Sequence, residues 1–201
     1  HNFDSIGQDI GRHLKIGEII WQTKEVPKTN LFSFTEPDFS FVNHHWLSEV
    51  LFYGVFSWFG FSGLIILKAF FVFLSFFILF LAVKKQAGFW PVVVSFLLSL
   101  FIFISRTEAR PEVFSFAILA FFLFVLFKAK YLTSDVRTYS WLWLLPVLEL
   151  LWVNLHIYFF IGPFLLTAFI VDRLANQDYS RLKTTTLIWF LTFAATLSNP
   201  N

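Results

Sequence analysis

The chain has 201 residues, of which 57% are hydrophobic, 22% are aromatic and only 14% are charged. Soluble domains contain roughly 45–50% apolar and about 25% charged residues, so this composition excludes an ordinary soluble domain and predicts a multi-pass membrane protein. The net charge of +2 is too small to indicate nucleic acid as a partner, and the absence of cysteine excludes a disulfide framework and a thiolate metal site.

Residues 1–61 form the only large polar region of the sequence. Apolar residues near its start fall on one helical stripe: Ile6, Ile10, Leu14 and Trp21. This stripe predicts an amphipathic helix that lies on the membrane surface. An irregular loop follows between Pro27 and Pro37, and a second short helix is expected at 46–59, where Trp and Tyr suit the headgroup zone. The sequence GFSG then predicts the end of this helix.

Five apolar runs follow the polar region. The run at 64–83 is long enough to span a bilayer, whereas those at 89–105 and 111–127 are slightly short. The run at 141–171 would be about 46 Å long as one helix, which exceeds a hydrocarbon core of about 30 Å. Two short crossings are therefore expected, with a break near NLHIYFFIGP. The last run covers residues 186–197.

Basic residues occur in every second loop, as the positive-inside rule predicts for cytoplasmic loops. In chain order they are Lys84, Lys85, Lys128, Lys130, Arg137, Arg173, Arg181 and Lys183. This alternation predicts an all-α polytopic transmembrane bundle in the plasma (inner) membrane, with 1–61 as an extracytoplasmic loop and 62–201 as the transmembrane region. Because the chain begins with His1 and contains no Met, we expect it to be a piece of a longer protein.

The predicted topology gathers the unusual polar residues on the outer face. They are Asp9, His13, Asn43, His44, His45, Glu49, Arg106, Arg110, Glu112, Asn154, His156 and Asn199. Polar groups at membrane depth are costly and commonly mark a site or a pathway. Two further polar residues, Lys68 and Glu149, fall inside predicted spans, where snorkelling or a buried polar contact explains them.

The spacing of these residues leaves alternatives open. Asp9 and His13 lie one helical turn apart, as a general acid–base pair or as a solvated ion pair. His44, His45 and Glu49 could hold a metal ion, since His45 and Glu49 are also one turn apart, but histidines at the membrane interface more commonly cap and anchor helices. No HExxH spacing is present, so no metal site is predicted.

Arg106 and Arg110 precede a predicted helix that has Pro111 in its first turn. Free N–H groups at a helix start and two guanidinium groups suit a phosphate. An ion-pair network with Glu108 and Glu112 explains the same residues equally well. Asn154 and His156 are expected chiefly to satisfy the backbone of a broken helix.

Three stretches, DIGRHLKIGEII, VPKTNLFSFT and VNHHWLSEVLF, resemble the first extracytoplasmic loop of bacterial polytopic glycosyltransferases of the C type (GT-C). These are relatives of the protein O-mannosyltransferases and the lipid A aminoarabinose transferases. Further on, ARPEVFSF, LWVNLH and SNPN resemble other stretches of this group. His45 and Glu112 depart from the pattern, which more often has Glu and Gln at these positions.

The resemblance implies an inverting glycosyltransferase that takes a sugar from a polyprenyl-phosphate donor and passes it to a glycan, lipid or protein acceptor. Asp9 corresponds to the catalytic Asp and would deprotonate the acceptor hydroxyl, with Asp4 as its rival. The expected substrate-binding residues are His13, Asn43, His44, Glu49, Arg106, Arg110 and His156. A divalent cation is not required, and the cofactor is left open.

Two other functions compete with this interpretation. A transporter or flippase for lipid-linked glycans would use the same basic groups without bond cleavage, and a non-catalytic membrane scaffold would keep only the fold. Transporters tend to place charge near the midplane of the membrane. The charge in this sequence collects at one face, which favours the enzyme.

Overall fold

A computed structural model describes residues 9–36, 39–84, 86–104, 108–131 and 140–199. Its elements are α1 (Ile10–Thr23), α2 (Trp46–Val83), α3 (Phe89–Ile104), α4 (Glu112–Tyr131), η2 (Trp141–Trp143), α6 (Leu144–Leu155), η3 (Ile157–Phe160), α7 (Ile161–Ala175) and α8 (Leu182–Ala195). The described ranges contain no strand beyond an isolated bridge between Thr29 and Ser40. The predicted all-α class is therefore confirmed.

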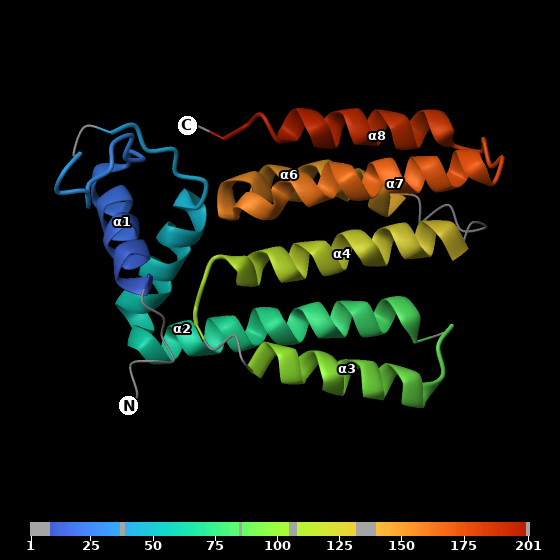
Figure 1. The fold of residues 1–201 in the computed structure, drawn as a ribbon, viewed down its shortest axis with the longest axis horizontal. Coiled ribbons are helices and arrows are strands. Elements are labelled where there is room, and N and C mark those ends of the chain that lie inside the picture. Colours follow the sequence, from blue (N-terminus) through green and yellow to red (C-terminus); the bar gives the residue numbers. More distant parts are fainter. Residues whose placement is uncertain (1–8, 37–38, 85, 105–107, 132–139, 200–201) are drawn as a thin grey trace.

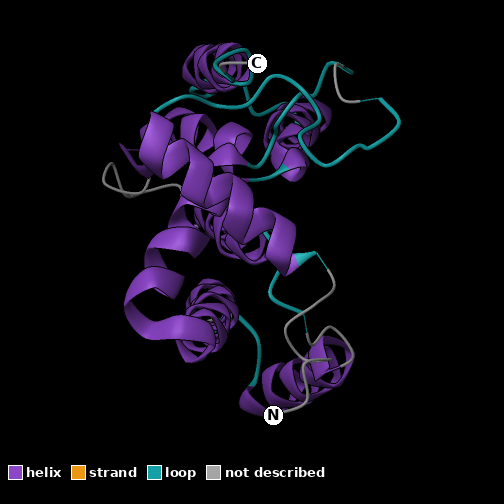
Figure 2. Cartoon of the chain, turned by 90° about the vertical axis from the view of Figure 1, so that its left-hand side faces the viewer, coloured by secondary structure: helices purple, strands orange, loops and turns teal. Residues whose placement is uncertain are grey.

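The helices form a bundle that has α1 across one end. Figure 1 shows α3, α4, α6, α7, α8 and the second part of α2 running side by side, while α1 and the first part of α2 stand across their left-hand end. Figure 2 looks onto that end. The loops at 24–45 lie there too, so the polar region of the sequence covers one end of an apolar bundle.

Helix α2 covers two predicted elements, which a kink separates. Helices at 46–59 and 64–83 with a break at GFSG were expected from the sequence, and the non-helical backbone of Gly60 confirms this break. Gly60 adopts φ 59° and ψ −155° at the bend, a conformation that glycine reaches without steric cost. The first part of α2 therefore packs along α1 and the second part joins the bundle.

The long run at 141–171 is divided, as predicted. His156 is extended, with φ −163° and ψ 149°, and it separates α6 from η3 and α7. The chain reverses there, so that Glu149 of α6 faces Gly162 of α7. A continuous helix would have carried the second half away from the first; the break returns it to the bundle.

Three helices are long and apolar enough to cross a membrane: Trp46–Val83, Glu112–Tyr131 and Ile157–Ala175. Three shorter apolar helices accompany them: Phe89–Phe101, Trp141–Leu155 and Leu182–Ala195. The runs expected at 64–83 and 111–127 thus fall within helices of spanning length. Those expected at 89–105 and 186–197 form shorter helices.

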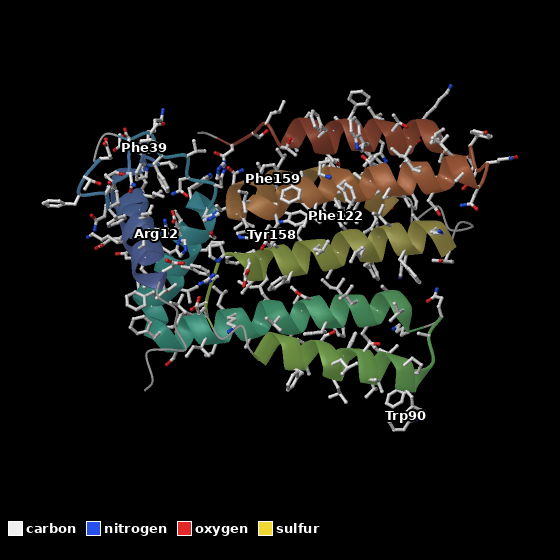
Figure 3. The ribbon with its side chains drawn as sticks, viewed as in Figure 1. Arg12, Phe39, Trp90, Phe122, Tyr158 and Phe159 are labelled. Atoms are coloured by element: carbon white, nitrogen blue, oxygen red, sulfur yellow. The ribbon has the colours of Figure 1, made fainter. Side chains whose placement is uncertain are left out.

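The interior of the bundle is built from large apolar side chains of α4, α6, α7 and α8. Those that are fully buried include Phe122, Leu145, Trp152, Leu166 and Ile188. Figure 3 shows Phe122 and Phe159 between the helices, whereas Trp90 of α3 points away from them. Because apolar side chains cover the outside as well, close packing rather than a difference in polarity distinguishes the core from the surface.

Candidate functional site

The polar residues that were predicted to share one face lie at one end of the bundle. They come from α1, the start of α2, the residues before α4, the turn at His156 and the end of α8 (Figures 1 and 2). These segments are far apart in the sequence. Their meeting defines a candidate site, which we call the polar end and which comprises Asp9, His13, Asn43, His44, His45, Glu49, Arg110, Ser115, Trp152, Asn154 and His156.

Glu49 is the centre of one half of the polar end. Its Oε1 lies 2.9 Å from His13 Nδ1, and its Oε2 accepts a hydrogen bond of 2.6 Å from Asn43 Nδ2. All three side chains are buried. A buried carboxylate needs such partners, because an unpaired charge would be strongly disfavoured. Glu49 therefore ties α1 and the loop before α2 to α2 itself.

A glycine makes this arrangement possible. Gly17 of α1 lies against the backbone of Glu49, and a Cβ atom at residue 17 would overlap the Glu49 carbonyl oxygen. Glycine lets two helix backbones approach more closely than any other residue does. The close crossing of α1 and α2 at Gly17 brings His13, one turn earlier in α1, to the Glu49 carboxylate.

His156 and His45 form the other half of the polar end. Their rings are 5.3 Å apart, and His156 Nδ1 lies 2.9 Å from Ser115 Oγ, which also accepts a 2.7 Å hydrogen bond from Trp152 Nε1. Burial, followed by the neighbouring His45 and His13, lowers the pKa of His156 to about 4. Burial also lowers the pKa of His45. Both rings are therefore neutral at physiological pH and can donate or accept a hydrogen bond.

Asp9 and Arg110 lie at the rim of the polar end. Asp9 precedes α1 with its side chain 53% exposed, and its Oδ2 is 3.9 Å from Arg110 Nη2. The same guanidinium group forms an ion pair with Glu108, and its buried Nε has no hydrogen-bond partner within the described part of the chain. Arg110 thus stands between two carboxylates, of which Glu108 was predicted as an ion-pair partner and Asp9 was not.

The side chains of Asp9 and His13 take different directions. His13 is 3% exposed and contacts Glu49, whereas Asp9 is turned toward Arg110. Asp9 and His13 therefore do not form the acid–base pair that their spacing suggested; each contacts a different residue instead. His44 lies beside His45, with ring centroids 6.4 Å apart. Arg106 and Asp4 lie outside the described residues.

Asn154 and Asn199 secure the end of α6. Asn154 Oδ1 accepts a 2.7 Å hydrogen bond from Trp46 Nε1, and its Nδ2 donates to the Leu150 carbonyl. Asn199 Nδ2 donates to the Val153 carbonyl at 3.1 Å. Asn154 was expected to satisfy backbone groups of the broken helix; it instead donates to a carbonyl inside α6 and joins α6 to the start of α2, while Asn199 reaches a carbonyl close to the break.

Ser115 and Trp152 belong to the site but were not predicted. Both fall on apolar helices, where a single serine or tryptophan resembles ordinary core. A serine within the Phe-rich stretch of α4 is the one sequence feature that could have indicated a buried hydrogen bond. Its partner, however, is supplied by another helix.

The His and Glu side chains of the polar end are directed to each other and to Asn43 and Ser115, and do not converge on one point. Among the residues with a described position, no group of three or more His, Asp or Glu side chains is arranged to hold a metal ion. Glu49, which was considered as a ligand together with His45, directs its two oxygens to His13 and Asn43 instead.

Comparison of the chain with protein-family models, with curated protein sequences and with solved structures gives no match. The function of the polar end is therefore argued from its own chemistry.

Proposed function

We propose that the chain belongs to a polytopic membrane glycosyltransferase that transfers a sugar from a polyprenyl-phosphate donor to an acceptor hydroxyl. The reaction takes place at the polar end, on the extracytoplasmic side of the plasma (inner) membrane. The observation that carries the proposal is the position of the exposed Asp9 carboxylate beside Arg110, at the end of an apolar bundle.

The chemistry requires a base and a cation close together. Asp9 removes the proton from the acceptor hydroxyl as the hydroxyl oxygen attacks the anomeric carbon. The bond from that carbon to the phosphate oxygen breaks, and the polyprenyl phosphate leaves with inversion. Arg110 binds the departing phosphate, whose negative charge grows as the bond breaks. Glu108 forms an ion pair with Arg110, and the phosphate of the donor takes the place of Glu108 at this guanidinium group.

The buried half of the polar end positions Asp9. Glu49 and Gly17 fix α1 against α2, and Asp9 is the residue immediately before α1. His13 is buried behind Asp9, so we assign it a positioning role. His45, whose buried Nδ1 has no hydrogen-bond partner in the described residues, lies on the side of the site nearer His156.

Asp9→Asn tests the proposal most directly, because it keeps the shape of the side chain and removes the base. We expect sugar transfer from a polyprenyl-phosphate donor to fall by about 10²–10⁴-fold. The matched control is Glu25→Gln, which neutralises an exposed acid on the same polar region and should leave turnover unchanged. Assays compare the full-length proteins at equal expression.

Asp4→Asn completes this experiment. An inactive Asp4→Asn beside a normal Asp9→Asn would move the base to Asp4. Normal turnover by both variants would remove acid–base catalysis from this region.

Transport of a lipid-linked glycan is the second candidate function, and one observation favours it. Glu149 is buried within the bundle, and ionisable groups inside a membrane commonly belong to a transport pathway. Vesicles that contain the protein and a polyprenyl-phosphate sugar distinguish the two functions. Transport moves the intact donor between leaflets, whereas the transferase consumes it only when an acceptor is present.

A further inference from the structure

Glu149 lies near mid-depth in the bundle. It is eight residues after Trp141 and seven residues before the break at His156. At a helical rise of about 1.5 Å per residue, these separations place it about 12 Å from one end of the apolar segment and about 10 Å from the other. The break at His156 is therefore about two helical turns away, and no step of the proposed transfer reaction uses Glu149.

The side chain of Glu149 is completely enclosed. Glu149 is 0% exposed, and neither of its carboxyl oxygens, Oε1 and Oε2, has a hydrogen-bond partner within the described ranges. Oε2 lies against Gly162, where a Cβ atom would overlap it and would also crowd the Phe122 ring. Gly162 of α7 thus leaves the space that the carboxyl group occupies.

The surroundings of Glu149 contain nothing that would stabilise a negative charge. No charged group or hydrogen-bond donor of the described residues, including those of α2, α4, α7 and α8, pairs with its carboxyl group. Glu49, the other buried acid among the described residues, has both a histidine and an amide as partners. An ionised carboxylate without partners is much more costly to bury than a neutral carboxylic acid.

We propose that Glu149 is a proton-binding site inside the bundle, occupied at neutral pH and closed by the contact of its carboxyl group with Gly162 at the start of α7. The proton is released only when Gly162 moves away from this carboxyl group and water reaches it. Glu149 would then change the charge of the bundle interior at a depth where charge is rare. This inference rests on burial and does not depend on the proposed sugar transfer.

A space-filling role is the simpler alternative, and Glu149→Gln separates the two. Glutamine keeps the volume and the shape of the side chain but cannot bind or release a proton. Infrared difference spectra of the full chain in phospholipid vesicles, wild type minus Glu149→Gln at neutral pH, should contain the carbonyl stretch of a protonated carboxyl group. The band should move to lower frequency in D₂O.

Glu112→Gln is the matched control, because Glu112 is a partly exposed acid on another helix. The band assigned to Glu149 should be absent from the wild type minus Glu112→Gln difference spectrum, because both of these proteins retain Glu149. The proposal is overturned if the Glu149 difference spectrum shows only carboxylate bands. If Glu149→Gln does not fold, ¹³C NMR of the wild-type chain labelled at the glutamate carboxyl carbon decides the question. A carboxyl carbon in its protonated form at neutral pH supports the proposal, and its absence overturns it.

Discussion

At the residue scale, His156 has the surroundings that most oppose a positive charge. It is 8% exposed, its Nδ1 is engaged by Ser115, and the rings of His45 and Tyr158 lie on it at 5.3 and 4.3 Å. Burial contributes most to its low pKa, and repulsion from His45 and His13 adds to the effect. A neutral His156 is thus part of the folded structure.

This state predicts a pH dependence of stability. Between about pH 6.5 and about pH 4, the unfolded chain binds a proton at residue 156 that the folded chain does not. The contribution of neutral His156 to the free energy of unfolding should therefore be complete above pH 6.5. It should be lost as the pH falls toward 4, which lowers the free energy of unfolding by up to about 3 kcal/mol. His45, whose pKa is also lowered, acts in the same direction. Unfolding in detergent at a series of pH values measures the slope.

His156→Asn should flatten this slope, since asparagine cannot take up the proton. His44→Asn is the matched control, because it removes a less buried histidine of the same polar end. An unchanged slope in His156→Asn would contradict the assignment.

At the element scale, the crossing of α1 and α2 depends on one missing side chain. Gly17 faces Glu49, and a Cβ atom there would overlap the Glu49 carbonyl and lie 2.9 Å from Tyr53 Cβ. The first of these neighbours is backbone, so a side-chain rotation cannot relieve the overlap. The distance between the two helices must increase instead.

Gly17→Ala should therefore destabilise the protein by about 1–3 kcal/mol, as overpacking of a close contact does. Gly11→Ala is the matched control in the same helix. Residue 11 has nothing within 4 Å of a Cβ atom, so alanine there should be neutral or stabilising by up to about 1 kcal/mol. Unfolding of both variants gives the comparison. Equal stabilities would show that α1 and α2 do not approach as closely as the structure indicates.

At the scale of the whole molecule, the two ends of the bundle differ in chemistry. One end carries the histidines, Asp9 and Arg110. The other end, on the right of Figure 1, carries the end of α2 and, on its far side, the loop at 176–181. Arg173 and Lys130 near that second end pair with Asp178 and Asp172. We expect the polar end to face outward and the second end to face the cytoplasm, as the positive-inside rule indicates.

Single cysteines test this orientation, because the chain contains none of its own. Thr35→Cys, in the loop at the polar end, should react with a membrane-impermeant maleimide on intact cells. Tyr179→Cys, between α7 and α8 and 66% exposed, should react only after the membrane is permeabilised. The opposite result at both positions would reverse the topology, and reaction of both on intact cells would refute the predicted sidedness.

Sequence alone determined the all-helical class, the reversal at His156 and the position of the bend at Gly60. These features depend on local properties: the length of apolar runs, the period of the apolar stripe and the backbone freedom of glycine. It also identified most residue types of the polar end, because polar side chains are conspicuous in so apolar a chain.

Only the tertiary structure decided which of these residues meet. His13 and Asp9 are neighbours on one helix, yet the first contacts Glu49 and the second approaches Arg110. Ser115 and Trp152 proved to be part of the site, where they are hydrogen-bonded to each other. Glu149 has no hydrogen-bond partner among the described residues. These outcomes depend on helix crossings at small residues such as Gly17 and Gly162. The reason is physical: spacing along a helix sets which face a side chain occupies, but the packing of several helices sets what that face touches.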